Sequence, residues 1–453
     1  MVLDPAMLIA TFPNARPCHF WALARFFRVP VLGRVFRSAG VLPVDTKTHS
    51  NAKLFEHTLD CLERGGVIAL FPEGTSYTAP CHLPFKDGIS WATYEYLSQQ
   101  ASKSKDPVKI SIVPVGITAS SSGPRLSEDW EIANVVGIVT SRYGEPIIVS
   151  SEDLHQFQQV SKETVKELTT RIAHGVEQGT INSPDWDTAN AASEAKFLLF
   201  GDARGVRLED HTRVSQSQSF IDIFHPDEML KDDEHKEDRA ELKQQLLTFS
   251  KMLKRLRLTA LDISMYENQE ITWWRALLRL ISTWMALAVQ LPLFLPGMIV
   301  NFPIYVLGRL VNRFEKYAES VAQDKLVVSI GFAIPLYSIV LYLLWRALGS
   351  TLLGFVIALA LIPMFAWYHM ALVDKRYDTL KQVIASWRIF NAVVTGETYG
   401  IHQRREIEDC VQLRRWCHSR TKTLLINLAQ SGNPKAQYLV EYGRPLFQCD
   451  TSS

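Results

Sequence analysis

Long apolar runs in the second half of the chain constrain its fold more than any other feature. Residues 276–311 carry only two charged side chains, Arg279 and Arg309, and residues 326–345 and 351–373 carry no Asp, Glu, Lys or Arg. A helix rises about 1.5 Å per residue, so each run is long enough to cross a hydrocarbon core of about 30 Å. We therefore expect these segments to lie in a membrane rather than inside a soluble domain.

The spacing of the apolar runs predicts transmembrane hairpins within residues 276–373. Only residues 346–350 separate the second run from the third, so these two should form a tight hairpin. Prolines interrupt the first run and remove helical hydrogen bonds, so another hairpin or a pair of short helices is expected there. Basic residues flank the same ends of the runs, and the positive-inside rule then places both termini in the cytosol.

The charge and cysteine content exclude several classes of protein. Lys and Arg number 48 against 47 Asp and Glu, whereas a nucleic-acid binder that relies on bulk charge is far more basic. Six cysteines are scattered without a paired CxxC spacing, which argues against a zinc site and a disulfide framework and suits a reducing compartment. The first residues lack the pattern of a cleaved signal peptide, so none is expected.

Before residue 180 the apolar pattern alternates between helical and strand periods. The alternating segments are residues 51–64, 67–71, 87–97, 108–118, 135–141, 145–149 and 165–176. Such alternation indicates an α/β fold in which helices flank a largely parallel sheet. We expect residues 1–180 to form this domain and to carry the chemistry.

Two polar regions lie on either side of the apolar runs. Residues 181–275 are highly charged, and within them apolar residues recur at four- and three-residue spacing from Leu242 to Leu256. Two heptads are too few for a coiled coil, so we expect a helix that packs on its neighbours in a connecting region. Residues 374–453 are predicted to form a cytosolic helical tail.

The segment FPEGTS, at the end of a predicted strand, has an unusual composition. Pro72 cannot donate to a strand ladder, and Gly74 allows a ligand to approach the backbone. The amides and hydroxyls of Gly74, Thr75 and Ser76 can face an anion, while Glu73 can bind hydroxyl groups beside it. The segment thus suits a polyol phosphate, although an ordinary strand-to-helix turn can have the same residues.

Neighbouring segments make this signal more specific. FPEGTS lies between GVLPVD at residues 40–45 and IVPVGI at residues 112–117, with LPFKDG at residues 83–88 just behind it. In order and spacing these segments resemble the motifs of the glycerolipid acyltransferase superfamily. SPDWDTAN at residues 183–190 and LFLPGMIVNFP at residues 293–303 look like the fungal-type glycerol-3-phosphate and dihydroxyacetone-phosphate acyltransferases.

The resemblance implies an acyl-CoA-dependent O-acyltransferase of phospholipid biosynthesis in the endoplasmic reticulum membrane. Its most direct prediction is acylation of the sn-1 hydroxyl of glycerol-3-phosphate or dihydroxyacetone phosphate, with no metal or tightly bound cofactor. Acylation of a lysophospholipid and a catalytically inactive membrane paralogue are the alternatives. The implied partners are acyl-CoA, a phosphorylated acceptor and the lipid bilayer.

The same resemblance assigns roles to individual residues. Glu73 and Gly74 would bind the glycerol phosphate. A histidine would take the proton from the acceptor hydroxyl, and an aspartate would hold that histidine in the correct tautomer. Backbone amides would stabilise the oxyanion, and CoA would leave as a thiolate. The residues that would support the acceptor or shape the acyl side are Thr75, Ser76, Val113, Pro114 and Val115.

Two positions depart from the family pattern. The arginine expected in the second motif falls on Thr46, so the phosphate charge must be met elsewhere, with Lys47 and Lys86 as candidates. Asp4 fits the aspartate of the His-x4-Asp motif, but the histidine five positions earlier would precede Met1. The motif is therefore expected to be truncated.

Two other pairs in the chain have the His-x4-Asp spacing. They are His82 with Asp87 and His369 with Asp374. His82 follows the glutamate motif, whereas the base of the family precedes it, and His369 lies at the end of an apolar run. Neither pair is the expected base, although His82 with Asp87 is the replacement to test first.

One more segment predicts contact with a membrane surface. Between Arg16 and Arg37, five arginines alternate with aromatic residues such as Phe20, Trp21 and Phe26. This mixture at helical spacing is typical of an interfacial helix at anionic headgroups. A nucleic-acid surface has a similar composition, but the neutral total charge and the apolar runs downstream disfavour it.

Overall fold

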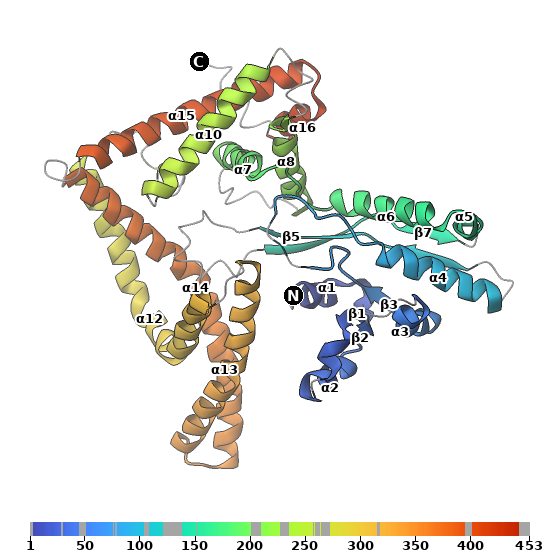
Figure 1. The fold of residues 1–453 in the computed structure, drawn as a ribbon. Coiled ribbons are helices and arrows are strands. Elements are labelled where there is room, and N and C mark those ends of the chain that lie inside the picture. Colours follow the sequence, from blue (N-terminus) through green and yellow to red (C-terminus); the bar gives the residue numbers. More distant parts are fainter. Residues whose placement is uncertain are drawn as a thin grey trace. The chain divides into compact units, whose positions relative to one another are not determined.

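The computed structural model describes most of the chain in separate stretches. These are residues 3–28, 30–44, 51–75, 77, 79–103, 108–120, 138–150, 152–200, 210–226, 235–256, 258, 263, 272–314, 318–394 and 401–443. The chain divides into two compact units, which are described one at a time (Figure 1). The first consists of Met1–Ala119, Val139–Ser183 and Leu208–Val214, and the second contains the remaining residues.

A small parallel sheet organises the first unit. Its strands lie in the order β2 (Leu42–Val44), β1 (Cys18–Leu23) and β3 (Val67–Ala69), and β1 is parallel to both neighbours. The FPEGTS loop follows β3 directly, so its position is fixed by the carboxyl end of that strand. The α/β class and the parallel sheet predicted from the sequence are therefore confirmed.

The central strand corrects the prediction of one interfacial helix between Arg16 and Arg37. Phe20 is buried on β1 and stacks on Phe71, because β1 pairs on both sides and buries its own aromatic residues. The mixed basic and aromatic surface is confined to the segments that follow β1. These are the 3₁₀ helix η2 (Ala24–Arg28) and the helix α2 (Pro30–Ser38).

Four further strands of this unit form two pairs. β4 (Lys109–Ile112) is antiparallel to β7 (Ile147–Ser150), and β5 (Val115–Ser120) pairs with β6 (Ile138–Tyr143). The single strand predicted at residues 108–118 is split in two, since Pro114 has no amide for a ladder. The antiparallel pair of β4 and β7 departs from the largely parallel sheet that was predicted.

Helices cover the strands of the first unit. A buried cluster joins apolar residues of α4, α5, α6 and β7. Val165, Leu168 and Ile172 of α6 belong to it, as their helical spacing predicts. The bounds are α1 (Leu3–Thr11), α3 (Asn51–Glu63), α4 (Gly88–Lys103), α5 (Asp153–Gln159) and α6 (Ser161–Glu177).

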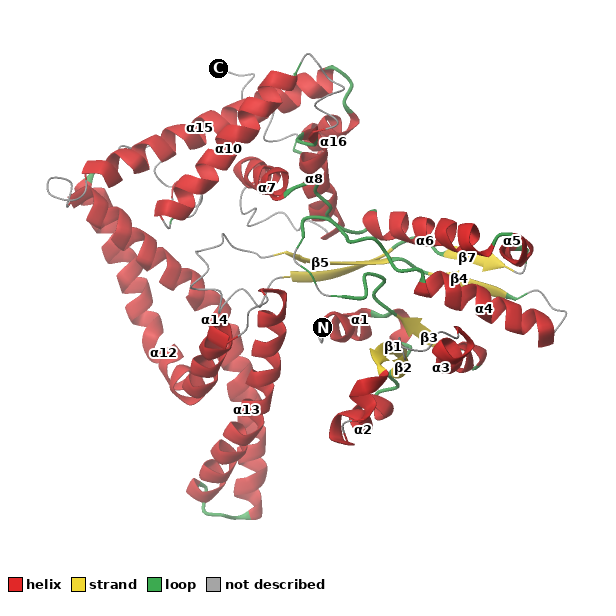
Figure 2. Ribbon diagram, in the orientation of Figure 1, coloured by secondary structure: helices red, strands yellow, loops and turns green. Residues whose placement is uncertain are grey.

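The second unit is helical throughout its long described elements (Figure 2). Leu242, Leu246 and Phe249 of α10 are buried in a core that also contains residues of α7, α15 and α16. The helix predicted to pack on its neighbours is therefore confirmed. The bounds are α7 (Trp186–Phe200), α8 (Asp210–Ile223), α10 (Lys236–Leu256), α12 (Trp273–Phe314), α13 (Ala318–Ala347), α14 (Leu352–Val394), α15 (Ile401–Gln430) and α16 (Pro434–Tyr442).

Three described helices are long and apolar enough to cross a membrane. Their candidate spans are Trp273–Val311, Val327–Ala347 and Leu352–Met370. The predicted hairpin is present between α13 and α14, and its turn places Gly349 and Ser350 at positive φ. Length and composition thus make the chain a membrane-associated protein.

The first apolar run is one helix, contrary to the predicted hairpin or pair of short helices. Its helical hydrogen bonding continues past all three prolines, Pro292, Pro296 and Pro303. Phe294 and Tyr305 both contact the ring of His369, at centroid distances of 5.5 and 6.1 Å. In a straight helix these two residues are about 16 Å apart along the axis at about 1.5 Å per residue, so the prolines bend α12 rather than end it.

Candidate active site

The first unit contains a cavity of about 1150 Å³ beside β3. Asp4 of α1 lines it, together with Glu73 and Thr75 of the FPEGTS loop and the segment Val113–Val115 between β4 and β5. Most of the other lining residues are apolar. The structure therefore brings the predicted orienting acid, two of the predicted acceptor-binding residues and the acyl-side residues around one space, whereas Gly74 and Lys86 are not among the lining residues.

The FPEGTS loop has a basic side chain directly over its glycine. Gly74 has a φ of +64°, and its amide donates to the Phe71 carbonyl at 3.1 Å. The Lys86 amide donates to the Pro72 carbonyl at 2.9 Å, which holds the two segments together. A Cβ at residue 74 would lie 2.6 Å from Lys86 Nζ, so glycine leaves the space that this ammonium group occupies.

This geometry corrects one detail of the predicted anion site. The amide of Gly74 closes the turn onto Phe71 and does not point to a ligand. The ammonium group of Lys86 takes the corresponding position over the loop. The positive charge of the site therefore comes from a side chain and not from the Gly74 amide.

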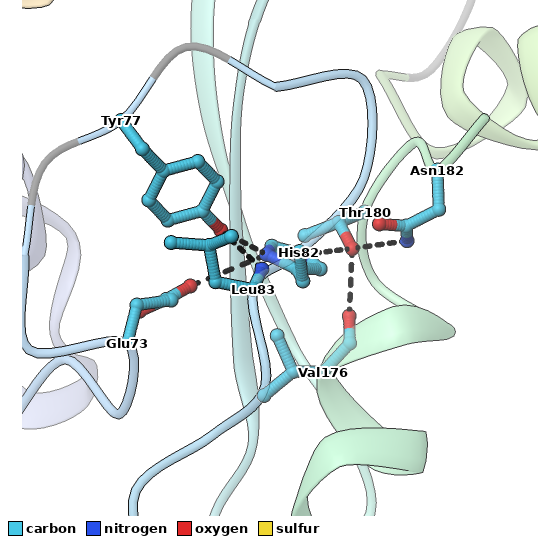
Figure 3. Close-up of polar contacts among 7 residues, drawn as sticks. All are labelled: Glu73, Tyr77, His82, Leu83, Val176, Thr180 and Asn182. Atoms are coloured by element: carbon cyan, nitrogen blue, oxygen red, sulfur yellow. Dashed lines mark hydrogen bonds and ion pairs between the residues drawn. The ribbon is translucent and has the colours of Figure 1, made fainter. Parts of the chain in front are cut away.

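A hydrogen-bonded network holds the carboxylate of Glu73 (Figure 3). His82 Nδ1 lies 3.2 Å from Glu73 Oε1 and 3.3 Å from the Tyr77 hydroxyl. On the other side of the ring, His82 Nε2 lies 2.9 Å from Thr180 Oγ1. The side chains of Glu73 and His82 are only 16% and 22% exposed. The network thus ties the loop after β3 to the segment after α6.

The partners of Thr180 fix the tautomer of His82. The Thr180 hydroxyl donates to the Val176 carbonyl at 3.0 Å and accepts from the Asn182 amide at 3.0 Å. Its oxygen therefore acts as an acceptor for His82, so Nε2 carries a proton. A neutral His82 then accepts at Nδ1 from the Tyr77 hydroxyl, whereas a protonated His82 donates there to the carboxylate of Glu73.

The surroundings shift the pKa values of the two carboxyl groups of the cavity in opposite directions. Burial disfavours the charged form of Glu73, but the hydrogen bond from His82, a backbone hydrogen bond and the positive charge of His82 outweigh it and lower the pKa of Glu73. Burial raises the pKa of Asp4, and the negative charge of Glu73 adds to that rise. Such a divergence between neighbouring carboxyl groups is typical of catalytic sites.

The two other His-x4-Asp pairs do not form a second base. Asp87 accepts a hydrogen bond from the Thr169 hydroxyl at 2.9 Å, and Glu73 takes the place beside His82 that the spacing gave to Asp87. His369 is buried in the second unit, and the side chain of Asp374 lies outside the described residues. His82 and Asp87, which share the motif spacing but were not the expected base, therefore have different partners in the structure.

Sequence reasoning missed part of the network and named residues that the structure leaves undescribed. Lys47 and Ser76, both predicted to contact the acceptor, lie outside the described residues. Tyr77 directly follows the motif and was available as a candidate by position alone. Thr180 is 98 residues from His82, and no local pattern links the two, so only the fold identifies it.

The described residues offer no obvious metal centre. Among them, no group of three or more His, Cys, Asp or Glu side chains is placed to hold a metal ion. Of the described cysteines, Cys81 is exposed and the others are buried as free thiols. The cavity itself presents carboxylates, a histidine and hydroxyl groups, and Lys86 lies over the adjacent Gly74.

Residues 1–118 match the family model described as Acyltransferase. The match includes α1 with Asp4, the parallel sheet, the FPEGTS loop and the following Lys86. Together with the relatives below, this match supports the resemblance that the motifs predict, between this domain and the glycerolipid acyltransferase superfamily.

Two curated relatives extend the likeness beyond this domain. Over 73% of its length the chain is 24% identical to glycerol-3-phosphate O-acyltransferase 2 of Saccharomyces cerevisiae. Over 65% of its length it is 21% identical to glycerol-3-phosphate O-acyltransferase 1 of the same yeast. These alignments cover 43% and 36% of the two yeast proteins, so the chain spans less than half the length of either relative. No solved structure matches the chain.

Proposed function

We propose that the chain is an acyl-CoA-dependent O-acyltransferase that esterifies the sn-1 hydroxyl of glycerol-3-phosphate or dihydroxyacetone phosphate. The observation that carries the proposal is the combination of a held carboxylate, Glu73, in a largely apolar cavity with the ammonium group of Lys86 over the adjacent Gly74. These features complement the hydroxyl, acyl and phosphate groups of the substrates. The names of the two yeast relatives agree with this acceptor class.

In this proposal the acceptor binds at the FPEGTS loop. An ionised carboxylate only accepts hydrogen bonds, so Glu73 suits the hydroxyl groups of a glycerol unit. Its lowered pKa keeps it ionised at neutral pH. Lys86 attracts the phosphate as a point charge, with Lys47 as a second candidate, and the hydroxyl of Thr75 lines the same cavity.

The acyl donor occupies the apolar side of the cavity. Val113, Pro114 and Val115 lie where the chain passes from β4 to β5, and Ile117 and Tyr143 continue this wall. Pro114 interrupts the strand, so the segment faces the cavity instead of pairing along its whole length. We expect the thioester end of acyl-CoA to lie between this wall and Glu73.

The reaction transfers the acyl group directly. The acceptor oxygen attacks the thioester carbonyl carbon, a C–O bond forms, the C–S bond breaks and CoA leaves as a thiolate. The hydroxyl proton passes to the histidine that the family resemblance places five positions before Asp4, and Asp4 keeps that histidine in the correct tautomer. His82 is not that base, because both of its ring nitrogens already have partners. We assign His82 as a positioning residue for Glu73.

Acyl transfer by the full chain in membranes tests the proposal. Labelled acyl-CoA is supplied with glycerol-3-phosphate, dihydroxyacetone phosphate or lysophosphatidate, and the lipid products are separated. We expect a lysophosphatidate-type product from the first two acceptors. Product from lysophosphatidate alone would establish the lysophospholipid alternative. No product from any acceptor, also from a chain extended with a histidine five positions before Asp4, would establish an inactive paralogue.

A designed extension tests the role of Asp4. The family resemblance places a histidine five positions before this residue. A chain extended to carry that histidine should be about 10²- to 10⁴-fold more active than the printed sequence, which is the usual contribution of a general base. The same extension with alanine in place of the histidine is the matched control. Equal activity of the two extended chains would remove Asp4 from the proposed mechanism.

We also propose that both termini lie on the cytosolic side of the endoplasmic reticulum membrane. Residues of α10, before the membrane region, share a core with residues of α15, after it, and Arg255 pairs with Glu406 at 3.0 Å. This shared core supports placing both flanks on one side of the membrane, which requires an even number of crossings. The first span has 39 residues, about 58 Å at about 1.5 Å per residue, so a bent α12 can enter and leave on the same side.

Glycosylation tags test this topology. Acceptor sites placed at each end of the chain should remain unmodified in microsomes, while a site in the turn between α13 and α14 should be modified if that hairpin spans the membrane. Modification at only one terminus would mean an odd number of crossings and would contradict the shared core.

A further inference from the structure

A cationic and apolar surface lies on the segment that follows β1. No Asp or Glu occurs between Asp4 and Asp45, whereas the same stretch contains five arginines. Four of them fall within residues 24–38, on η2 and α2. These residues are called the arginine patch below, and the four are Arg25, Arg28, Arg34 and Arg37.

Apolar side chains are exposed among the arginines of the patch. All four arginines are exposed, and none forms an ion pair with another described residue. Phe26 is 37% exposed and Val35 is 53% exposed. The guanidinium of Arg25 lies over the ring of Phe26, 5.0 Å from its centroid. The patch therefore presents positive charge and apolar surface together.

Packing of α2 against η2 fixes which face of α2 points outward. Phe36 contacts Phe27 edge to face at 5.6 Å between centroids, and a Cβ at Gly33 would clash with the Phe27 carbonyl. Successive residues of a helix are about 100° apart. With Gly33 and Phe36 turned inward, Arg34, Val35, Arg37 and Ser38 occupy one continuous outward arc of α2.

We propose that the arginine patch docks on the surface of an anionic lipid bilayer. Guanidinium groups attract anionic headgroups, while exposed aromatic and aliphatic side chains enter the boundary between headgroups and acyl chains. A nucleic acid would use the charges but not Phe26 and Val35. The chain has three candidate membrane spans, so it is already attached to a bilayer. This inference does not depend on the proposed acyl transfer.

The patch is also close in the chain to the cavity. Trp21 of β1 lines the cavity, and the strand ends at Leu23, which is 37% exposed immediately before η2. Docking of η2 and α2 would hold this end of the strand at the lipid surface. The patch thus supplies a reason for arginines that the proposed catalytic mechanism does not use.

A fluorescent probe on the patch tests the proposal in the full chain. Val35→Cys is labelled with an environment-sensitive dye after the exposed Cys81 and the C-terminal Cys449 are replaced by serine. The protein is reconstituted in phosphatidylcholine vesicles with or without phosphatidylserine, and the quencher is a lipid spin-labelled on its acyl chain. Ser38→Cys is a second probe on the same arc, and Ala101→Cys is an exposed control on α4.

We expect quenching at both patch probes in phosphatidylserine vesicles, weaker quenching in phosphatidylcholine alone or at high salt, and none at the control. Replacing all four patch arginines by glutamine should remove it, since each arginine near an anionic surface changes the docked-to-undocked ratio about fivefold. The matched variant replaces four other exposed basic residues, Arg64, Lys162, Lys166 and Arg171, by glutamine and should leave quenching unchanged.

Three results would overturn the proposal. Absence of quenching in both kinds of vesicle would place the patch in water or against protein. Equal quenching in both, with no effect of the four glutamines, would remove the electrostatic recognition. A response of the probes to duplex DNA but not to spin-labelled lipid would identify a nucleic-acid surface instead.

Discussion

Two histidines with the same sequence spacing have opposite surroundings in this molecule. His82 precedes Asp87 by five positions, and His369 precedes Asp374 by five. His82 lines the cavity of the first unit and has polar partners at both ring nitrogens. His369 is 6% exposed in the second unit and shares a hydrogen bond with the Tyr305 hydroxyl at 2.7 Å.

The difference shows that surroundings, and not spacing, decide what each histidine does. In both regions a glycine admits a basic side chain: Gly74 lies against Lys86, and Gly297 lies against His369. In the first unit the admitted ammonium group lies over Gly74, the residue that follows the cavity-lining Glu73. In the second unit the admitted ring stacks on Phe294 and joins α12 to α14. The first arrangement can bind a ligand, and the second packs helices.

The largest expected effect tests this division directly. Glu73→Ala should lower acyl transfer by tens to hundreds of fold, since loss of a group that binds the reacting substrate costs about 2 to 4 kcal/mol. Membrane insertion and expression should be unchanged. The matched control is Glu56→Ala, an exposed acid on α3, which should keep full activity.

The same assay on His369→Ala sharpens the comparison. We expect transfer per folded molecule to stay within a few-fold of the unmodified chain, because His369 packs between helices. A loss as large as that of Glu73→Ala would show that the histidine of the second unit takes part in the reaction. Activity of Glu73→Ala above about a tenth of normal would remove Glu73 from the acceptor site.

Gly297→Leu should destabilise the membrane helices without altering substrate affinity. A side chain at residue 297 would occupy the space of the His369 ring, and overpacking of this kind costs about 1 to 3 kcal/mol. Gly308→Leu on the same helix is the matched control, because nothing lies within 4 Å of its Cβ position. Unfolding in detergent is measured for both, and equal midpoints would contradict the described packing.

Gly74→Ala should weaken acceptor binding more than the backbone strain of the substitution explains. Gly74 and Gly65 both have positive φ, at +64° and +73°, so alanine at either position costs about 1 to 2 kcal/mol of backbone strain. Only residue 74 faces Lys86; nothing lies within 4 Å of a Cβ at residue 65. The KM for the phosphorylated acceptor should therefore rise for Gly74→Ala but not for Gly65→Ala.

Lys86→Ala tests the same contact from the side of the lysine. A charge that contacts phosphate equally in the ground and transition states raises KM and leaves kcat nearly unchanged when it is lost. We expect Lys86→Ala to behave in this way, and Gly74→Ala to add little to it in the double variant. An unchanged KM would move the phosphate to Lys47 or to the arginines that follow β1.

Much of the fold could be predicted because its signals are local. Helical periods gave α3, α6 and α10, and the second and third apolar runs gave the hairpin of α13 and α14. β1 was missed because arginines and aromatic residues around it have helical spacing, while its burial depends on pairing with β2 and β3 far along the chain. The bend in α12 was mistaken for two helices, because a sequence shows the prolines but not the packing that stabilises the helix across them.

The candidate site could be predicted only in part, for the same reason. Glu73, Gly74 and Lys86 lie in compact motifs, so their closeness was foreseeable. The contact between His82 and Glu73 is made across a loop that has neither helical nor strand periodicity. Thr180 follows α6 and is 98 residues from His82 along the chain. The motif spacing of His82 and Asp87 does not make them partners, because an interval along a loop does not place two side chains on one face.

The smallest expected effect is a change in pH dependence, and it decides whether His82 positions Glu73 or only fills space. His82 lowers the pKa of Glu73, since its hydrogen bond and charge outweigh the effect of burial. The ionised carboxylate is the form that accepts hydrogen bonds from the acceptor, so kcat/KM should fall as pH falls through the pKa of Glu73 in the folded protein. His82→Gln keeps a donor but loses the charge, while burial of Glu73 remains. The pKa of Glu73 must then rise, and the acidic limb of kcat/KM should move to higher pH with a nearly unchanged plateau.

Tyr77→Phe is the matched control, because burial raises the pKa of the Tyr77 phenol and keeps it neutral in this range. A limb that stays in place in His82→Gln, or that moves equally in Tyr77→Phe, would show that His82 does not set the charge of Glu73.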